Sequence, residues 1–167
     1  LLALAAGLTA MRFAFQERWE LAVFAIAVAA VFDTLDGRIA RLLRGASKFG
    51  AELDSLSDFV CFGVAPAMIL FLLAMPDSGR GAWVLVMLFP MGMGLRLARF
   101  NVATEDEEAP DWKAHFFTGI PAPGGAGLVL LPMILSFQVG DELFRSPWIV
   151  SIFLFGVGGL LVSSIPT

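Results

Sequence analysis

The chain has a single cysteine and a single histidine in 167 residues. Cys61 cannot form an intrachain disulfide, and we expect it to pack between helices as a small apolar side chain. His115 has no second histidine or cysteine near it in the sequence, which disfavours a zinc site. A disulfide framework and a thiolate or imidazole metal centre are therefore poor explanations for this protein.

Charged residues are also scarce. They make up 16% of the chain, against 58% hydrophobic residues, and the mean hydropathy is +0.82. These values lie outside the range of soluble globular proteins. The net charge of -4 offers no basic patch for nucleic acid. The composition predicts an integral membrane protein and argues against a nucleic-acid partner.

Apolar segments separated by polar turns predict an all-α polytopic bundle of about six transmembrane helices, forming one domain over residues 1–167. The expected spans are residues 1–15, 21–44, 52–75, 82–100, 116–140 and 146–167. The second has only twelve apolar residues before Asp33, too few to cross ~30 Å of hydrocarbon, so its helix is expected to continue to about Arg44. A turn at 45–50 and a kink at Pro66 are expected. Both chain ends appear cut, because they fall within apolar segments.

Four aspartates interrupt this apolar pattern at helical spacing. Asp33 and Asp36 lie three residues apart, and Asp54 and Asp58 lie four apart. Residues at these spacings share one face of a helix, so each pair points one way. Two such pairs on facing helices would converge.

Small residues beside the first pair leave space next to the carboxylates. Gly37 and Ala40 cannot fill that face, and Arg41 and Gly50 follow them. A carboxylate in a membrane helix costs about 2.5–3.5 kcal/mol, so four uncompensated ones would cost roughly 10–14 kcal/mol. A water-filled cavity or bound cations must offset this cost, and clustered carboxylate oxygens suit Mg²⁺ or Mn²⁺. The segment predicts a divalent metal site.

The same segment resembles the signature of the CDP-alcohol phosphotransferase family, D-x2-D-G-x2-A-R-x8-G-x3-D-x3-D. The matching positions are Asp33, Asp36, Gly37, Ala40, Arg41, Gly50, Asp54 and Asp58. Two later motifs, LRLARFN at 95–101 and FFTGIPAPGGAG at 116–127, make the chain similar to the phosphatidylserine-forming members of that family. The resemblance extends along essentially the whole chain.

The resemblance implies an enzyme of phospholipid biosynthesis, a homodimer, that moves a phosphatidyl group from CDP-diacylglycerol to L-serine and releases CMP. It implies that two Mg²⁺ or Mn²⁺ ions are held by Asp33, Asp36 and Asp54. Asp58 would complete the metal site and take the proton from the attacking hydroxyl. The implied CDP-lipid-binding residues are Gly37, Ala40, Arg41 and Gly50.

An amino-acid acceptor needs a cation for its carboxylate. Arg96 and Arg99, three residues apart at the end of a predicted span, offer forked donors of the right kind, and Asn101 follows. We expect these three residues to bind the acceptor or the lipid phosphates. Two alternatives stay open: the arginines are positive-inside anchors, or they bind the phosphate of another acceptor such as glycerol phosphate or inositol phosphate.

The distribution of lysine and arginine predicts the orientation. Seven of them fall on the aspartate side of the predicted spans and four on the other side, so the aspartate face is expected to be cytoplasmic in the cell (inner) membrane. Intramembrane aspartates on facing helices are also typical of divalent cation transporters. Against transport, these lie at helix ends rather than at the midplane, and no inverted repeat is visible.

Overall fold

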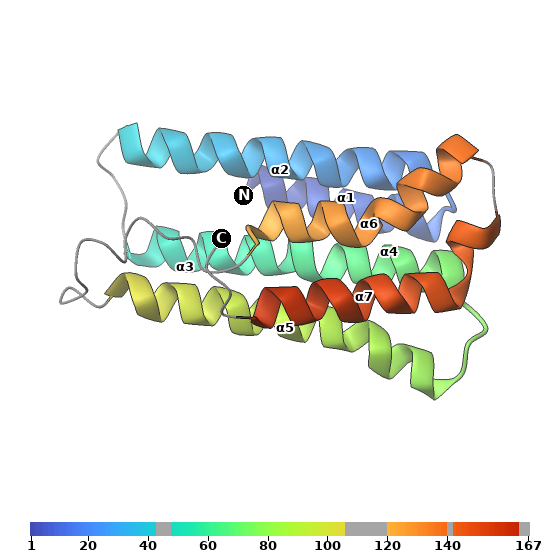
Figure 1. The fold of residues 1–167 in the computed structure, drawn as a ribbon. Coiled ribbons are helices and arrows are strands. Elements are labelled where there is room, and N and C mark those ends of the chain that lie inside the picture. The colour runs from blue at the N-terminus through green and yellow to red at the C-terminus, as the bar shows by residue number, and fades with distance from the viewer. Residues whose placement is uncertain (43–47, 106–119, 140–141, 164–167) are drawn as a thin grey trace.

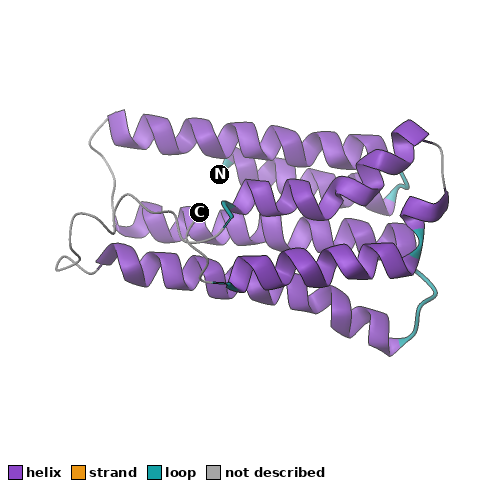
Figure 2. Cartoon of the chain, viewed as in Figure 1, coloured by secondary structure: helices purple, strands orange, loops and turns teal. Residues whose placement is uncertain are grey.

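The computed structural model describes residues 1–42, 48–105, 120–139 and 142–163, and all regular structure in these ranges is helical (Figure 2). The predicted all-α class is confirmed. The elements, in chain order, are α1 (Leu2–Phe15), α2 (Trp19–Leu42), α3 (Lys48–Asp58), the π-helix η1 (Phe59–Val64), α4 (Ala65–Ala74), α5 (Arg80–Glu105), α6 (Ala122–Val139), the 3₁₀ turn η3 (Glu142–Arg145) and α7 (Pro147–Val162).

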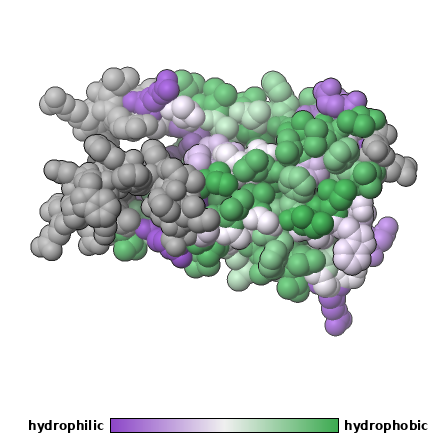
Figure 3. Space-filling model, in the orientation of Figure 1, coloured by the Kyte–Doolittle hydropathy of each residue, from purple (hydrophilic) through white to green (hydrophobic). Residues whose placement is uncertain are grey.

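The helices run side by side as one elongated bundle (Figure 1). At one end lie the α1–α2 turn, the α4–α5 connection and the start of α7. At the other end lie the end of α2, the start of α3 and the end of α5. On the face shown in Figure 3, hydrophobic side chains cover the middle of the bundle and hydrophilic ones gather toward its ends. This distribution is the one expected of a bundle that crosses a membrane.

Three helical segments of the described chain are long and apolar enough to cross a membrane. They are Lys48–Ala74, Arg80–Val102 and Ala122–Val139. Helices α1 and α7 are apolar but shorter, at 14 and 16 residues. Helix α2 has 24 residues but carries Asp33 and Asp36 within its length. The fold is therefore that of a membrane protein, and the count of six spans stays a prediction.

Helix α2 continues through Asp33, as predicted. Three other helix boundaries differ from the predicted ones. The predicted turn at Gly50 is wrong, because α3 already begins at Lys48; a glycine costs little there, since first-turn amides have no helical partner in any case. Helix α5 extends to Glu105 rather than ending at 100.

The third difference is the start of α6. It begins at Ala122 and not at residue 116, because the prolines at 121 and 123 favour a first helical turn over a helix interior. Residues 116–119, like the predicted loop around His115 and the acidic residues 106–108, lie outside the described residues.

The irregularity predicted at Pro66 takes the form of the π-helix η1, which joins α3 to α4. The amide of Ala65 donates to the carbonyl of Val60, five residues back. Pro66 follows at the start of α4 and has no amide to continue the ladder. A π turn shifts the register of the residues after it. As a consequence, the aspartates of α3 and the buried side chains of α4 can each face their own neighbours.

Helix α1 packs closely against η1 at Gly7. A Cβ atom on Gly7 would lie 2.6 Å from the Sγ of Cys61 and 3.0 Å from its Cα. The Cys61 thiol is fully buried and donates a hydrogen bond of 3.1 Å to the carbonyl of Ala3. Cys61 is thus a packing residue between helices, as predicted, and it joins α1 to the segment that directly follows Asp58.

We predict that Gly7→Ala destabilises the protein, because the new methyl group meets backbone as well as side chain. Overpacking of this kind costs about 1–3 kcal/mol. The measurement is the midpoint of thermal unfolding in detergent. Gly156→Ala in α7 is the matched control, since nothing lies within 4 Å of the added atom, and it should leave the midpoint unchanged or raise it. Equal midpoints for the two variants would contradict the close α1–η1 contact.

Candidate active site

The four aspartates predicted to converge lie at the same end of the bundle, on two helices. Asp33 and Asp36 are on the second half of α2, and Asp54 and Asp58 are on α3. The end of α2 and the start of α3 lie at the left in Figure 1. Asp54 is exposed and the other three are half-buried. Asp58 keeps α-helical backbone angles, with φ of -59° and ψ of -44°, so the π-helix begins only after the Asp54–Asp58 pair.

The two pairs lie within electrostatic reach of each other. Asp54 is exposed to the charges of Asp33 and Asp36 of α2, and Asp58 to those of Asp33 and Asp54. Like charges at this range repel one another. That the four carboxylates form one site stays a prediction.

Within the described residues, no basic side chain forms an ion pair with any of the four aspartates. Asp58 Oδ1 is buried and has no hydrogen-bond partner. Repulsion among the carboxylates and an unsatisfied buried oxygen each destabilise the fold unless a ligand compensates them.

The donor set fits a divalent cation in type and in charge, since carboxylate oxygens are the ligands that Mg²⁺ and Mn²⁺ prefer. In the described part of the chain, no three histidine, cysteine, aspartate or glutamate side chains are arranged so that they could hold a metal ion. The described side chains therefore form no ready-made metal site, and metal binding by these aspartates stays a prediction.

Arg96 of α5 lies beside this group. Its guanidinium is half-buried and interacts through charge with Asp58. The two side chains form no ion pair within 4.0 Å, and the Nε of Arg96 is buried without a hydrogen-bond partner. A buried arginine donor and the buried oxygen of Asp58 are thus both unsatisfied at the same end of the bundle, which is the arrangement of a site built for a polar ligand.

The other two predicted acceptor residues have partners on neighbouring helices. Arg99 is exposed, and its guanidinium donates a 3.0 Å hydrogen bond to the carbonyl of Val162 at the end of α7. The amide oxygen of Asn101 accepts a 3.1 Å hydrogen bond from Ser55, and its nitrogen donates to Glu52 at 3.4 Å. The three residues predicted as one group therefore have different surroundings.

The residues predicted to contact a CDP-lipid are described only in part. Gly37 is half-buried in α2, and Gly50 is exposed in the first turn of α3. Ala40 and Arg41 are in α2, but the positions of their side chains lie outside what the structure describes. The sequence interpretation did not single out Glu52 and Ser55, which contact Asn101. Their spacing of three residues, which places them on one face of α3, was the signal that could have identified them.

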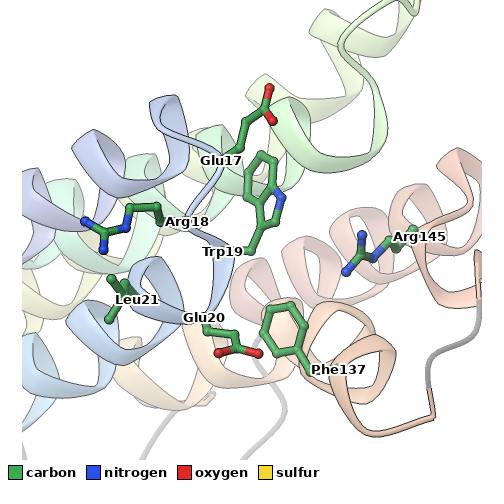
Figure 4. A pocket seen from close by; sticks show the side chains of 7 residues that line it. All are labelled: Glu17, Arg18, Trp19, Glu20, Leu21, Phe137 and Arg145. Atoms are coloured by element: carbon green, nitrogen blue, oxygen red, sulfur yellow. The ribbon is translucent and has the colours of Figure 1, made fainter.

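A surface pocket (Figure 4) is lined by elements at the end of the bundle that lies at the right in Figure 1, opposite the start of α3. It is formed by the α1–α2 turn and by the ends of α6 and η3. Its lining residues are Glu17, Arg18, Trp19, Glu20, Leu21, Phe137 and Arg145. It holds both charge signs and none of the predicted site residues, so the chemistry argued from the sequence belongs to the aspartate end.

Comparison with known proteins agrees with the motif. A family model described as CDP-alcohol phosphatidyltransferase matches residues 1–159. Three relatives are each named CDP-diacylglycerol--serine O-phosphatidyltransferase. The one from Mycobacterium leprae is 44% identical over 165 residues, covering 99% of this chain and 55% of the relative. Those from Helicobacter pylori and Methanocaldococcus jannaschii are 35% and 37% identical, over 95% and 81% of this chain. The chain spans 55–65% of the length of these relatives.

We predict that Mn²⁺ or Mg²⁺ raises the unfolding midpoint of the wild-type protein, because the cation relieves repulsion only in the folded state. Saturation at a hundred times the dissociation constant adds about 2.7 kcal/mol to the free energy of unfolding. Asp33→Asn should raise the midpoint in EDTA, by removing one of the repelling charges, and reduce the gain from metal. Equal gains in the wild type and the variant would contradict a metal site at these aspartates.

Proposed function

The chain belongs to the CDP-alcohol phosphatidyltransferase family, and from this membership we propose that it transfers a phosphatidyl group from CDP-diacylglycerol to L-serine, giving phosphatidylserine and CMP. The single observation that supports this most is that Asp33 and Asp36 of one helix and Asp54 and Asp58 of another have the family's spacing and lie within electrostatic reach of each other. The printed names of the relatives favour serine as the acceptor.

The family generally uses divalent metal ions. Here Asp33, Asp36 and Asp54, completed by Asp58, would hold two ions of the Mg²⁺ or Mn²⁺ type. Such ions, when bound, neutralise charge on a pyrophosphate and make its phosphorus more electrophilic. Gly37, Ala40, Arg41 and Gly50 are assigned to the CDP-lipid.

Asp58 is the proposed general base. Its Oδ1 is buried and unpartnered, so it is available to accept the proton of the serine hydroxyl. The hydroxyl oxygen forms a bond to the phosphorus that carries diacylglycerol, and the bond from that phosphorus to the bridging oxygen of the pyrophosphate breaks. The electron pair leaves with CMP, and the proton stays on the Asp58 carboxylate. The reaction is balanced without any redox partner.

Arg96 is the proposed partner of the serine carboxylate. Its buried, unpartnered Nε and its interaction with Asp58 support a ligand between the two side chains. Such a ligand has its acidic group toward Arg96 and its hydroxyl toward Asp58, as an amino acid with a short hydroxylated side chain does. A phosphate-bearing acceptor, such as glycerol phosphate or inositol phosphate, would use the same arginine, so acceptor competition decides between them.

The surrounding architecture follows from the same proposal. We assign residues 1–167 to one transmembrane domain of six spans in the cell (inner) membrane. The aspartate end faces the cytoplasm, because the lysine and arginine distribution favours it and because serine is dissolved there. The active unit is assigned as a homodimer.

The proposal is tested by CMP release from CDP-diacylglycerol in detergent micelles with separate acceptors. We predict that serine with Mn²⁺ or Mg²⁺ supports release, and that EDTA abolishes it. Glycerol phosphate and inositol phosphate should release CMP more slowly than serine. Faster release with either one would reassign the protein to a sister phosphotransferase.

For Asp58→Asn we predict a loss of about 10²–10⁴ in kcat, the usual contribution of a general base. Binding of CDP-diacylglycerol should persist, because the amide keeps the shape of the side chain. Single-turnover rates with saturating serine and metal measure the chemical step directly. A variant with near wild-type single-turnover rates would show that another group takes the proton.

For Arg96→Ala we predict a rise of about 10- to 100-fold in the KM for serine, since a hydrogen bond to a charged group contributes about 1.5–3 kcal/mol. The KM for CDP-diacylglycerol should change less. Arg99→Ala is the matched comparison, because that guanidinium is bonded to Val162, and its effect on the serine KM should be smaller. A larger effect at Arg99 would reverse the assignment.

A further inference from the structure

Asn101 is the point at which the end of α5 is hydrogen-bonded to α3. Its amide oxygen accepts from the Ser55 hydroxyl at 3.1 Å, and its amide nitrogen donates to Glu52 Oε2 at 3.4 Å. Both partners belong to α3 and lie three residues apart, on one face of that helix. A single side chain therefore bridges two helices through a donor and an acceptor at once.

This bridge holds α3 on both sides of Asp54. Glu52 precedes that aspartate by two residues, and Ser55 follows it directly. Because the bridge uses one donor and one acceptor at fixed positions, a rotation of α3 about its axis breaks both bonds. All side chains of a helix turn together when it rotates, so a rotation of α3 would also turn Asp54 and Asp58 away from α2.

The same helix α5 carries Arg96, five residues before Asn101. Arg96 interacts with Asp58, whereas Asn101 contacts Ser55, three residues earlier on α3. The two helices are thus connected at two levels: Arg96 and Asp58 form the inner one, whose polar atoms are unsatisfied, and the Asn101 bridge forms the outer one, which is satisfied. The inner level needs the outer one, because the Asp58 carboxylate and the Arg96 guanidinium form no ion pair or hydrogen bond that would fix α3 against α5.

We propose that Asn101 is a positioning residue, which bridges α5 to Glu52 and Ser55 and so sets the Asp54–Asp58 pair toward α2 and Arg96. The sequence alone had grouped Asn101 with the acceptor-binding residues. This inference rests on the proposed function, because the pair it positions is the pair assigned to that reaction. Its direct consequence is for cation binding, which is measurable without any substrate.

The test measures Mn²⁺ binding to the purified chain, without substrates, and the kinetics of CMP release for the same variants. Asn101→Ala and Ser55→Ala should each weaken Mn²⁺ binding by about 5- to 30-fold, which corresponds to ~1–2 kcal/mol. The double variant Asn101→Ala with Ser55→Ala should bind Mn²⁺ no more weakly than the weaker-binding single variant, because both substitutions disrupt the same bridge. The KM for serine should stay within about twofold of wild type.

A polarity swap keeps the proposal testable if truncation at Asn101 unfolds the protein. Asn101→Asp places a carboxylate beside Glu52 and should weaken Mn²⁺ binding. Adding Glu52→Gln restores a donor and an acceptor in reversed order, and should return the affinity to within about threefold of wild type. Thr34→Ala is the matched control, since its hydroxyl bonds only within α2, to Ala30, although it directly follows Asp33. It should leave Mn²⁺ binding unchanged.

Three outcomes would overturn the inference. One is a raised KM for serine with unchanged Mn²⁺ binding in Asn101→Ala, which would make Asn101 an acceptor ligand. The second is an additive loss of Mn²⁺ affinity when Asn101→Ala and Ser55→Ala are combined. The third is that Glu52→Gln fails to restore the Mn²⁺ affinity of Asn101→Asp. If the wild type binds Mn²⁺ but releases no CMP, the proposed function fails while the binding data still decide the role of Asn101.

Discussion

Mutual repulsion among four carboxylates is the constraint on which this fold depends. They stand on two helices of a mainly apolar bundle, and within the described residues no side chain forms an ion pair with any of them. A bundle that holds them together must contribute rigid support from elsewhere. The support lies in α1, which packs through Gly7 onto Cys61 just after Asp58, and in α5, which is bonded to α3 and α7.

The same constraint explains why function belongs to this end of the bundle. Polar atoms left unsatisfied in a protein interior are costly, and natural structures keep few of them. Here two such atoms, Asp58 Oδ1 and Arg96 Nε, belong to side chains that interact with each other. Under the proposed function, a polar substrate that enters with a divalent cation would satisfy both atoms and reduce the repulsion among the carboxylates.

Much of this arrangement could be predicted from the sequence, because helical periodicity is a local property. The spacing of Asp33 with Asp36, and of Asp54 with Asp58, was enough to place each pair on a helix, and the short apolar run before Asp33 was enough to extend α2. The convergence of the two pairs on one site stays a prediction. Helix ends were less accessible: the first turn of α3 includes Gly50, where a turn was expected, because tertiary contacts decide whether a glycine ends a helix or begins one.

The grouping of Arg96, Arg99 and Asn101 shows the limit most clearly. Arg96 and Arg99, three residues apart, differ by only about 60° in direction, so the spacing cannot separate them, whereas Asn101, two residues after Arg99, points about 160° away from it. The separation came from neighbours distant in sequence, Val162 for Arg99 and Ser55 for Asn101. The π-helix before Pro66 was likewise foreseen only as a kink, since its form depends on how α3 and α4 pack.

The central claim is that the four aspartates form one cation site that acts on a CDP-lipid. Electron paramagnetic resonance of Mn²⁺ added to the purified chain tests it most directly, with and without a CDP-lipid. The account predicts saturable binding of one or two ions per chain, and a change of the bound-Mn²⁺ spectrum when a CDP-lipid carrying ¹⁷O in its pyrophosphate is added. Absence of saturable binding, or a bound spectrum that the labelled lipid leaves unchanged, would contradict it.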